Sequence, residues 1–327
     1  MNMIGLVRES GGYGDIICTG AAAWAIKAED SEEEVVSFVP EQFTSIASHL
    51  AGVDRVVSLG SLKDIQPHRR PRDSAFNSTE FPYLSPLLQY PEAHFVDLYC
   101  PGFANENSCG GQLQYNRCQL FAMAAGVRNI LEARPEWTVT ARERELYQRW
   151  RKMHELSANP LDVRLIAVQL RGTCAARSIP QSMRLPLVEA LSEFGRVILF
   201  DCVPVSFEAP ASAIQCIGQP LPLVAAILEQ CATAVTVDSA LWHLTAALGI
   251  PTVGIFGPTD GQVASQTYPF HTALDGYSSS CELACNYSRM KHWSRRCRET
   301  GCSRLRKHTV EDIASAVQDK LKKVKDV

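Results

Sequence analysis

Short apolar runs alternate with helix-length patterns along the first part of the chain. The apolar runs Met3–Arg8, Glu34–Val39 and Val53–Leu59 read as strands, and the intervening patterns at Ile16–Ala28 and Glu41–Ala51 read as helices. Strands and helices in this order form right-handed βαβ units with a parallel sheet. The pattern therefore predicts an α/β domain with a doubly wound sheet.

Residues 61–92 interrupt this alternation with segments rich in proline and charge, which predict a long loop containing one short helix. A fourth strand at Phe95–Cys100 and a helix at Asn116–Ala125 follow. A charged helix then spans Thr140–Leu156, where Thr140 and the residue three positions later form a capping-box pattern. The linker-like Ser157–Pro160 predicts an N-terminal domain of residues 1–157 and a C-terminal domain of residues 158–327.

The alternation resumes in the second part of the chain and predicts a second doubly wound sheet. A final helix capped by Thr309 and Asp312 runs to about Lys323, and it is able to pack back on the first domain. The expected strands are Val163–Leu170, Arg196–Cys202, Ala213–Ile217, Ala234–Asp238 and Thr252–Phe256. The expected helices are Gln181–Phe194, Leu221–Gln230 and Ala240–Leu248.

The composition is that of a globular protein without a strong charge bias. The 327 residues include 32 Lys and Arg against 35 Asp and Glu, a net charge of −3, so a nucleic-acid partner is not expected. No apolar run approaches the roughly 20 residues that span a bilayer. The opening MNMIGLVRESGG lacks the features of a signal peptide, which predicts a cytoplasmic protein. No segment predicts an oligomeric state.

A glycine-containing loop connects the first predicted strand to the first helix. It reads Ser10-Gly-Gly-Tyr-Gly-Asp15, so Gly12 and Gly14 allow a ligand to approach the backbone closely. The amino end of the helix attracts anions. Asp15 is a candidate general base for a hydroxyl group, or alternatively a cap of its helix.

Three further loops of the second domain carry polar groups. Asp238 and Ser239 end a strand, and the first-turn amides from Ala240 are able to hold phosphate oxygens. His243 lies one turn later and is either a ligand contact or a packed core residue. In the loop Arg171–Arg177, Thr173 and Arg177 can neutralise a diphosphate, or the loop is simply solvated. The segment GPTD at 257–260 also reads as a turn.

Four of the twelve cysteines crowd into 22 residues with the spacing C-x3-C-x11-C-x4-C. Four thiolates at short loop spacings can close a tetrahedral site, which predicts a structural zinc or iron, while reduced, unligated thiols are the alternative. Basic residues between Arg289 and Lys307 also resemble a zinc ribbon on nucleic acid, but a solvated surface is the favoured explanation. The four residues are Cys281, Cys285, Cys297 and Cys302.

Together these segments resemble glycosyltransferase family 9, the heptosyltransferase family. The stretch from Val237 to Asp260, VDSALWHLTAALGIPTVGIFGPTD, is similar to the family's D-[ST]-G-x-x-H-L-x-A-A-L-G-x-P-T-V-x-x-[FY]-G-P-T-D nearly throughout. Gly14-Asp15 before an apolar helix resembles the family's start, and Arg177 stands three residues before a proline as in its K-x-W-P element. The late cysteines followed by HTVED resemble a tail of many members.

The resemblance implies a GT-B fold, with two Rossmann-like domains facing across a cleft, and an inverting transfer that needs no catalytic metal. The implied donor is a nucleotide-diphosphate sugar, typically ADP-heptose, and the implied acceptor is a glycan such as lipopolysaccharide core. On this reading Asp15 deprotonates the acceptor hydroxyl, while Arg177 and Thr173 hold the diphosphate. The donor's sugar-phosphate region would contact Asp238, Ser239, Ala240 and His243.

The sequence departs from the family pattern at several positions and leaves other functions open. Ala240 replaces the usual glycine, Arg177 replaces the commoner lysine, and Glu208 is the candidate for the family's ribose-binding glutamate. Some relatives heptosylate autotransporter proteins and carry cysteine metal sites, so a protein acceptor is the alternative. An epimerase or hydrolase of the nucleotide sugar, or a non-catalytic sugar-nucleotide binding module, are further alternatives.

Overall fold

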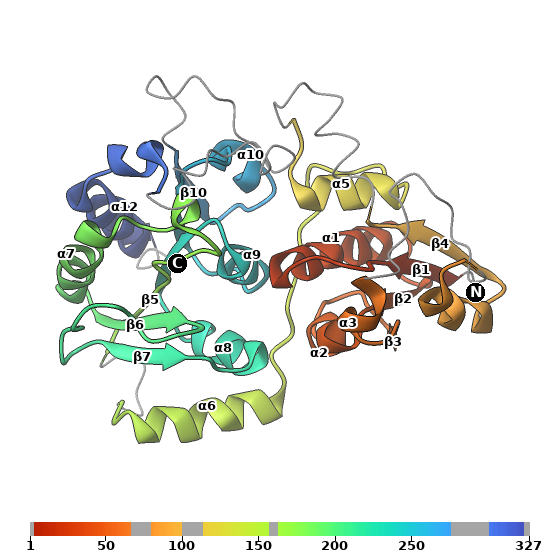
Figure 1. Cartoon of the computed structure of the whole chain (residues 1–327), viewed down its shortest axis with the longest axis horizontal. Helices are drawn as coiled ribbons and strands as arrows, with labels where there is room; N and C mark the ends of the chain where they lie inside the picture. Colours follow the sequence, from red (N-terminus) through yellow and green to blue (C-terminus); the bar gives the residue numbers. More distant parts are fainter. Residues whose placement is uncertain (1–2, 67–79, 100–113, 157–162, 276–300, 324–327) are drawn as a thin grey trace. The chain divides into compact units, whose positions relative to one another are not determined.

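The computed structural model describes residues 3–66, 80–99, 114–156, 163–275 and 301–323. The chain divides into two compact units (Figure 1): unit 1 comprises residues 1–110 and 114–138, and unit 2 comprises residues 111–113 and 139–327. Within the described residues, no helix has the length and apolar character required to cross a membrane.

Unit 1 is built on a four-stranded parallel sheet in the order β3-β2-β1-β4. The central apolar runs become strands with mostly buried side chains, as the interior of a parallel sheet requires, whereas the two edge strands are largely exposed or partly buried. Helix α1 (Tyr13–Glu29) connects β1 to β2 and packs along α5 (Arg117–Ala124) (Figure 1). The strands are β1 (Met3–Val7), β2 (Glu34–Val39), β3 (Arg55–Ser58) and β4 (Ala93–Asp97).

Two predictions for unit 1 are corrected. The continuous helix expected over 41–51 is a 3-10 turn η1 (Glu41–Phe43) followed by the four-residue α2 (Thr44–Ala47). The Thr44 and Ser48 hydroxyls donate to backbone carbonyls at 2.8 and 3.0 Å, and such local bonds compete with a longer helix.

In the segment predicted as a loop, α3 (Leu62–Ile65) is the expected short helix, but a second helical element, η3 (Pro82–Gln89), follows it. Its Leu84 and Leu87 are buried in the core of unit 1 beside Phe38. The segment was predicted as a loop because of its high proline content, yet η3 contributes buried side chains to the core of unit 1.

Unit 2 contains a six-stranded parallel sheet in the order β10-β9-β8-β5-β6-β7. The edge strand β10 was not predicted, because each of its five residues is only partly buried and its apolar signal is weak. The strands are β5 (Leu165–Val168), β6 (Arg196–Asp201), β7 (Ile214–Ile217), β8 (Thr233–Val237), β9 (Thr252–Phe256) and β10 (His271–Asp275).

The helical elements of unit 2 lie close to their predicted bounds where they were predicted. Their residues are η4 (Ala175–Arg177), α7 (Gln181–Ser192), α8 (Leu221–Leu228), α9 (Ala240–Ala247), α10 (Gly261–Ser265), η6 (Ser303–Lys307) and α12 (Val310–Lys323). Thr309 and Asp312 exchange the two predicted capping hydrogen bonds at 2.8 and 3.2 Å.

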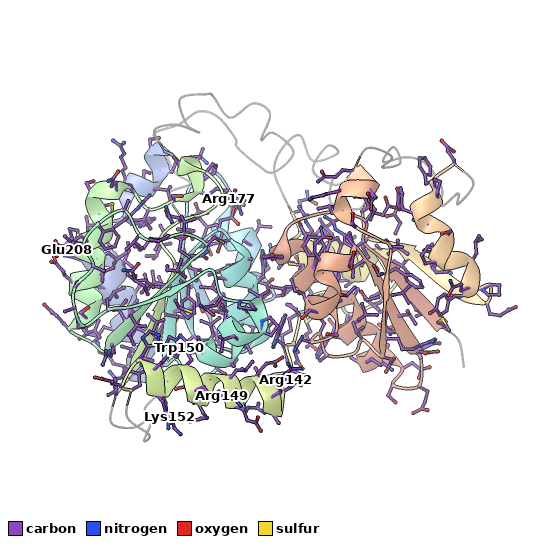
Figure 2. All side chains as sticks on the ribbon, turned by 60° about the horizontal axis from the view of Figure 1, so that its bottom comes forward. Arg142, Arg149, Trp150, Lys152, Arg177 and Glu208 are labelled. Carbon is purple, nitrogen blue, oxygen red and sulfur yellow. The ribbon has the colours of Figure 1, made fainter. Side chains whose placement is uncertain are left out.

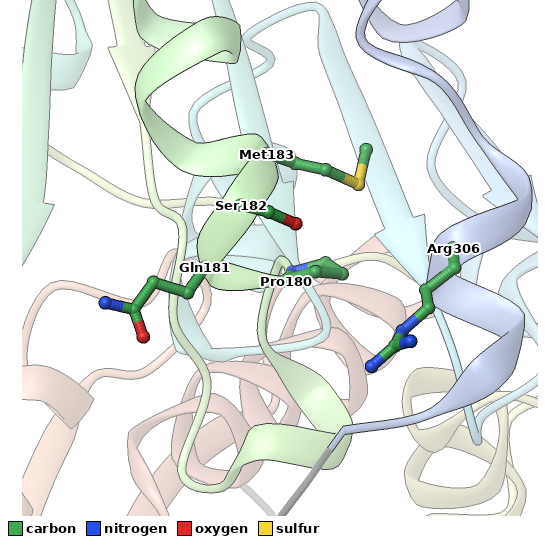
Figure 3. A pocket seen from close by; sticks show the side chains of 5 residues that line it. All are labelled: Pro180, Gln181, Ser182, Met183 and Arg306. Carbon is green, nitrogen blue, oxygen red and sulfur yellow. The ribbon is translucent and has the colours of Figure 1, made fainter.

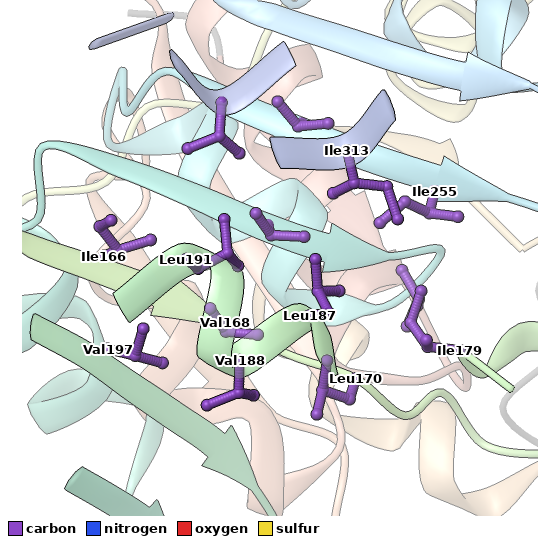
Figure 4. Packing of buried hydrophobic residues seen from close by; sticks show 14 of the residues in the cluster. Ile166, Val168, Leu170, Ile179, Leu187, Val188, Leu191, Val197, Ile255 and Ile313 are labelled. Atoms are coloured by element: carbon purple, nitrogen blue, oxygen red, sulfur yellow. The ribbon is translucent and has the colours of Figure 1, made fainter. Parts of the chain in front are cut away.

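The core of unit 2 joins the sheet to α7 and to the last helix (Figure 4). Ile313 and Val317 of α12 are fully buried with Leu187 of α7 and Ile255 of β9. The last helix is therefore an integral part of the core of unit 2.

Helix α6 (Ala141–Met153) begins with the predicted capping box between Thr140 and Glu143. It packs along α8 in unit 2 and buries Trp150, while Arg142, Arg149 and Lys152 follow its exposed side (Figure 2). The charged helix that precedes the predicted boundary at 157 thus packs against a helix of unit 2.

Candidate functional site

Each sheet has one position where the strand order reverses direction. In unit 1 this point lies between β1 and β4, and in unit 2 it lies between β5 and β8. Ligands of doubly wound sheets bind outside the carboxyl ends of the strands at such a point. The polar residues that follow β1, β5 and β8 are therefore the candidates for function.

In unit 1 the loop after β1 places Asp15 between two arginines. Arg117 of α5 donates a charged hydrogen bond to Oδ1 of Asp15, and the Arg8 guanidinium lies 3.6 Å from the same oxygen. Oδ2 accepts the backbone N–H of Gly12 at 2.9 Å, so Asp15 also performs the capping role that the sequence offered as the alternative. Two adjacent cations and an N–H donor favour the ionised carboxylate, which is the form a general base needs.

Arg8 is buried and forms the base of this cluster. Its guanidinium donates to the backbone oxygen of Leu98 at 2.5 Å and lies 5.3 Å from the centre of the Phe121 ring. Burial lowers the pKa of Arg8, and the nearby Asp15 opposes this effect. The loop after β4 thus fixes the arginine that fixes Asp15.

The glycines of this loop have different structural requirements. Gly11 has φ +139°, and a Cβ there would lie 2.8 Å from both Cβ and Oδ2 of Asp15. A Cβ on Gly12 would meet no atom within 4 Å. Gly14 lies within the first turn of α1. Gly11 is therefore the glycine that leaves room for the Asp15 carboxylate.

In unit 2 the loops after β5, β8 and β9 converge on Asp238. Arg177 donates to Oδ1 of Asp238 at 2.7 Å, and the Thr259 hydroxyl donates to Oδ2 at 2.6 Å. The side chain of Asp238 is 3% exposed, whereas that of Arg177 is 12% exposed. The structure thereby brings together two predicted site residues and the threonine of the GPTD segment.

The amino end of α9 is the second feature of this edge. Ser239 is its N-cap residue but makes no side-chain capping bond, because its hydroxyl donates to the side-chain oxygen of Gln169. Ala240 opens the helix and, like Ser239, is partly exposed. The Ser239 side chain therefore does not cap the first-turn amides of α9. An anion-binding helix end needs such amides to bind its ligand.

The Arg177 loop depends on a close backbone contact. A Cβ at Gly172 would lie 2.6 Å from the carbonyl oxygen of Arg177, so a larger residue there would displace the loop. Gly172 also donates its N–H to the Ser178 hydroxyl at 3.1 Å. Thr173, predicted to share the diphosphate with Arg177, is exposed.

His243 lies one turn into α9 and contacts Tyr268, which lies between α10 and β10. Its Nδ1 is 2.7 Å from the hydroxyl of Tyr268, which is 4% exposed. His243 itself is partly exposed. It is therefore neither fully buried in the core nor isolated at the surface.

Other polar groups of unit 2 have local structural roles. Asp260 caps α10 by accepting the N–H of Val263 at 3.0 Å, which is the turn role considered from the sequence. Arg171 donates to Asp201 at 2.6 Å and to the carbonyl of Val203 at 2.9 Å, so it fixes the loop after β6. Glu208, in the same loop, is exposed (Figure 2).

A pocket of about 460 Å³ opens at the amino end of α7, directly after the segment that carries Arg177 (Figure 3). Arg306 of η6 lies across it from the first turn of α7. Its lining residues are Pro180, Gln181, Ser182, Met183 and Arg306.

The predicted metal site falls largely outside the described residues. Cys281, Cys285 and Cys297 belong to that part of the chain, so their arrangement is not described. Cys302 is described, is buried, and precedes η6. Among residues 3–66, 80–99, 114–156, 163–275 and 301–323, no group of three or more His, Cys, Asp or Glu is arranged to hold a metal ion.

Comparison with known proteins gives a family and a fold. The family model "Glycosyltransferase family 9 (heptosyltransferase)" matches residues 219–300, which include β8, α9 and β9. Over residues 219–300 the chain is therefore similar to glycosyltransferase family 9. The predicted family resemblance, and with it the class of enzyme, is confirmed. No curated protein matches the sequence at a significant level.

Solved structures show a similar fold over nearly the whole length of this chain. The ADP-heptose LPS heptosyltransferase II of E. coli aligns with a TM-score of 0.67 at 15% identity, covering 99% of this chain and 100% of the other. A family 9 glycosyltransferase from Veillonella parvula gives 0.71 at 12% identity, with 98% of each chain covered. The iron-containing dodecameric glycosyltransferase TibC of enterotoxigenic E. coli gives 0.61 at 13%, covering 99% of this chain and 78% of the other. The predicted GT-B class of two Rossmann-like domains is confirmed.

Several residues of the two clusters were absent from the sequence-based site. Arg8 and Arg117 flank Asp15, Gln169 binds Ser239, Thr259 binds Asp238, and Tyr268 binds His243. Thr259 lies within the family-like stretch, so its position beside the carboxyl edge was available from the sequence. Arg117 is 102 residues from Asp15, and no local pattern pairs them.

Proposed function

We propose that this protein is an inverting glycosyltransferase that transfers heptose from ADP-heptose to a glycan acceptor such as lipopolysaccharide core. Asp15 is the general base for the acceptor hydroxyl. Arg177, Ser239 and the amino end of α9 bind the diphosphate of the donor, with Thr173 and His243 as further donor contacts.

One observation carries the donor assignment: a partly exposed Arg177 is bound to Asp238, which directly precedes the N-cap residue of α9, at the strand-order reversal of unit 2. A nucleotide diphosphate needs paired N–H donors and a cation, and an arginine supplies donors in a fixed fork. Asp238 is buried under Arg177 and orients the guanidinium. The carboxylate therefore prepares the cation for the diphosphate.

The assigned roles balance the reaction. The acceptor oxygen attacks the anomeric carbon of the donor sugar while its proton passes to Asp15. The bond between that carbon and the diphosphate oxygen breaks, and its electron pair leaves with the nucleoside diphosphate. Arg177 and the α9 amides stabilise this negative charge, which grows as the bond breaks. Attack from the opposite side of the leaving group inverts the anomeric centre.

Calorimetry tests the donor assignment. The full chain is titrated with ADP-heptose, UDP-glucose and GDP-mannose, and then compared with Arg177→Met. We expect ADP-heptose to bind most tightly and Arg177→Met to weaken it by roughly 10- to 100-fold, the value of a charged hydrogen bond. Arg128→Met is the matched control, because the Arg128 side chain is 91% exposed in unit 1. Failure of all three sugars to bind, or equal affinity in Arg177→Met, contradicts the proposal.

The choice between catalysis and simple binding is tested by transfer. Release of ADP from ADP-heptose is measured with and without lipopolysaccharide core and with an autotransporter protein as the other acceptor. Release that depends on the glycan supports the proposal. Release without an acceptor indicates a hydrolase, and binding without release indicates a binding module.

We also retain the four-cysteine structural metal as a proposal separate from the chemical step. Cys281, Cys285, Cys297 and Cys302 have thiolate spacings that suit zinc or iron. Elemental analysis of protein purified without chelator is expected to find about one zinc or iron site per chain. A metal-free, fully folded preparation contradicts it.

A further inference from the structure

Tyr268, in the connection between α10 and β10, contacts His243, which lies 25 residues earlier in the sequence. The Tyr268 hydroxyl lies 2.7 Å from Nδ1 of His243, which is well within hydrogen-bond distance. The two rings meet edge-to-face with centroids 5.9 Å apart. The contact therefore fixes both the position and the plane of the His243 ring.

The tyrosine is itself held rigidly. Its ring is edge-to-face with His271 at 5.2 Å and tilted against Trp242 at 6.0 Å, and Trp242 is fully buried. His271 is fixed in turn by the Trp242 carbonyl at 3.1 Å and the Thr245 hydroxyl at 3.2 Å. The Tyr268 hydroxyl is thus presented to His243 by a packed aromatic cluster.

The chemistry of the pair decides where the proton of a neutral His243 resides. A phenol O–H is more acidic than the N–H of a neutral imidazole, so the favoured bond has Tyr268 donating to Nδ1. A neutral imidazole carries one proton, which then lies on Nε2 and makes that nitrogen a donor. A donor can bind a phosphate or sugar oxygen, whereas an unprotonated nitrogen would repel its lone pairs.

We propose that Tyr268 is a positioning residue that holds His243 as the Nε2–H tautomer, so that His243 donates a hydrogen bond to the nucleotide-diphosphate sugar. The link to the donor rests on the proposed function above. The tautomer itself is a property of the free protein and is tested independently.

Tyr268→Phe removes the hydroxyl and keeps the ring. In full-length protein with ¹⁵N-labelled histidine, long-range ¹H–¹⁵N spectra distinguish the two tautomers, and His243→Gln identifies the His243 signals by their loss. We expect the Nε2–H pattern in the unsubstituted protein and a mixture with Nδ1–H in Tyr268→Phe. Tyr147→Phe is the matched control, since Tyr147 is also a buried tyrosine of unit 2 but lies on α6.

An Nδ1–H pattern in the unsubstituted protein, or an unchanged pattern in Tyr268→Phe, overturns the inference. ADP then serves as the probe for the ligand contact, and calorimetry is expected to show roughly tenfold weaker binding to Tyr268→Phe. Equal ADP affinity despite a shifted tautomer overturns the link to the donor. Absence of ADP binding to the unsubstituted protein contradicts the proposed function instead.

Discussion

Each unit has an Arg–Asp ion pair at the carboxyl edge of its sheet, but a different member of the pair is buried in each unit. In unit 1, Arg8 is 4% exposed and its partner Asp15 is 27% exposed. In unit 2, Asp238 is 3% exposed and its partner Arg177 is 12% exposed. The carboxylate is the accessible member in one unit, and the guanidinium is the accessible member in the other.

This difference explains why similar residues suit different reactants. The buried member of each pair is held by further hydrogen bonds, from Arg8 to the Leu98 carbonyl and from Thr259 to Asp238. The accessible member is thereby oriented without being covered. An accessible carboxylate suits a hydroxyl that must lose a proton, and an accessible guanidinium suits a diphosphate.

The largest expected effect is a loss of turnover when Asp15, the accessible carboxylate of unit 1, is replaced. Asp15→Asn keeps the shape of the side chain but removes its capacity to take a proton, so the transfer rate should fall by about 10³. Donor affinity should change little, since the donor ligands lie in unit 2. ADP release with acceptor and calorimetry with ADP-heptose measure the two effects. Asp319→Asn, at an exposed position on α12, is the control. Unchanged turnover would remove Asp15 from the proposed mechanism.

The two units should also respond differently to acid. Burial, aided by Lys320 and His243, lowers the pKa of His271 to about 3, although the Trp242 carbonyl opposes the shift. The unfolded imidazole binds a proton below its usual pKa of about 6.5, whereas the folded one does not until near 3. Unit 2 therefore loses stability as the pH falls through this window, by about 2 kcal/mol between pH 6.5 and 4.5.

Asp54 of unit 1 does not share this loss of stability between pH 6.5 and 4.5. Burial raises its pKa, but the Lys27 ammonium at 2.8 Å and the Val35 N–H outweigh this and lower it below the usual 3.8. The ionised Asp54 therefore stabilises the folded state fully above pH 3.8, and this contribution is lost only as the pH falls further, through the lowered pKa. Urea unfolding at pH 7.5 and 4.5 should therefore show a smaller loss in His271→Gln than in the unsubstituted protein. Equal losses would show that His271 does not cause the pH dependence.

A smaller effect on stability is expected from alanine substitutions of glycines in the loops after β5 and β1. Gly172→Ala places a Cβ against the Arg177 carbonyl and should reduce the free energy of unfolding by about 2 kcal/mol. Gly12→Ala adds a Cβ in open space at φ −95° and should change it by less than about 0.5 kcal/mol. Chemical denaturation measures both. Equal destabilisation would indicate that the contact in the Arg177 loop is not limiting.

The smallest expected effect concerns the second cation of unit 1. Arg117→Met removes one hydrogen bond to Asp15, while Arg8 and Gly12 still hold the carboxylate. Turnover should fall by about tenfold, and Arg128→Met is again the control. A decrease as large as that of Asp15→Asn would assign Arg117 a direct role with the reactants.

The candidate site shows how far sequence patterns extend. Asp15, Arg177, Asp238 and Ser239 are predicted as site residues because each follows a predicted strand, and the carboxyl ends of parallel strands share one edge of a sheet. The pairing of Arg177 with Asp238 was not found, because 61 residues separate them. Partners this distant depend on strand order, which no local periodicity contains.

The sequence by itself determined the alternation of strands and helices, the capping boxes at Thr140 and Thr309, and the family 9 stretch. These are local properties, since periodicity, capping and loop chemistry act over a few residues. Only the tertiary structure decided that Arg8 and Asp238 are the buried members of their pairs and that Tyr268 meets His243. Burial and long-range hydrogen bonds arise when distant segments pack together, and that packing sets which charge remains accessible.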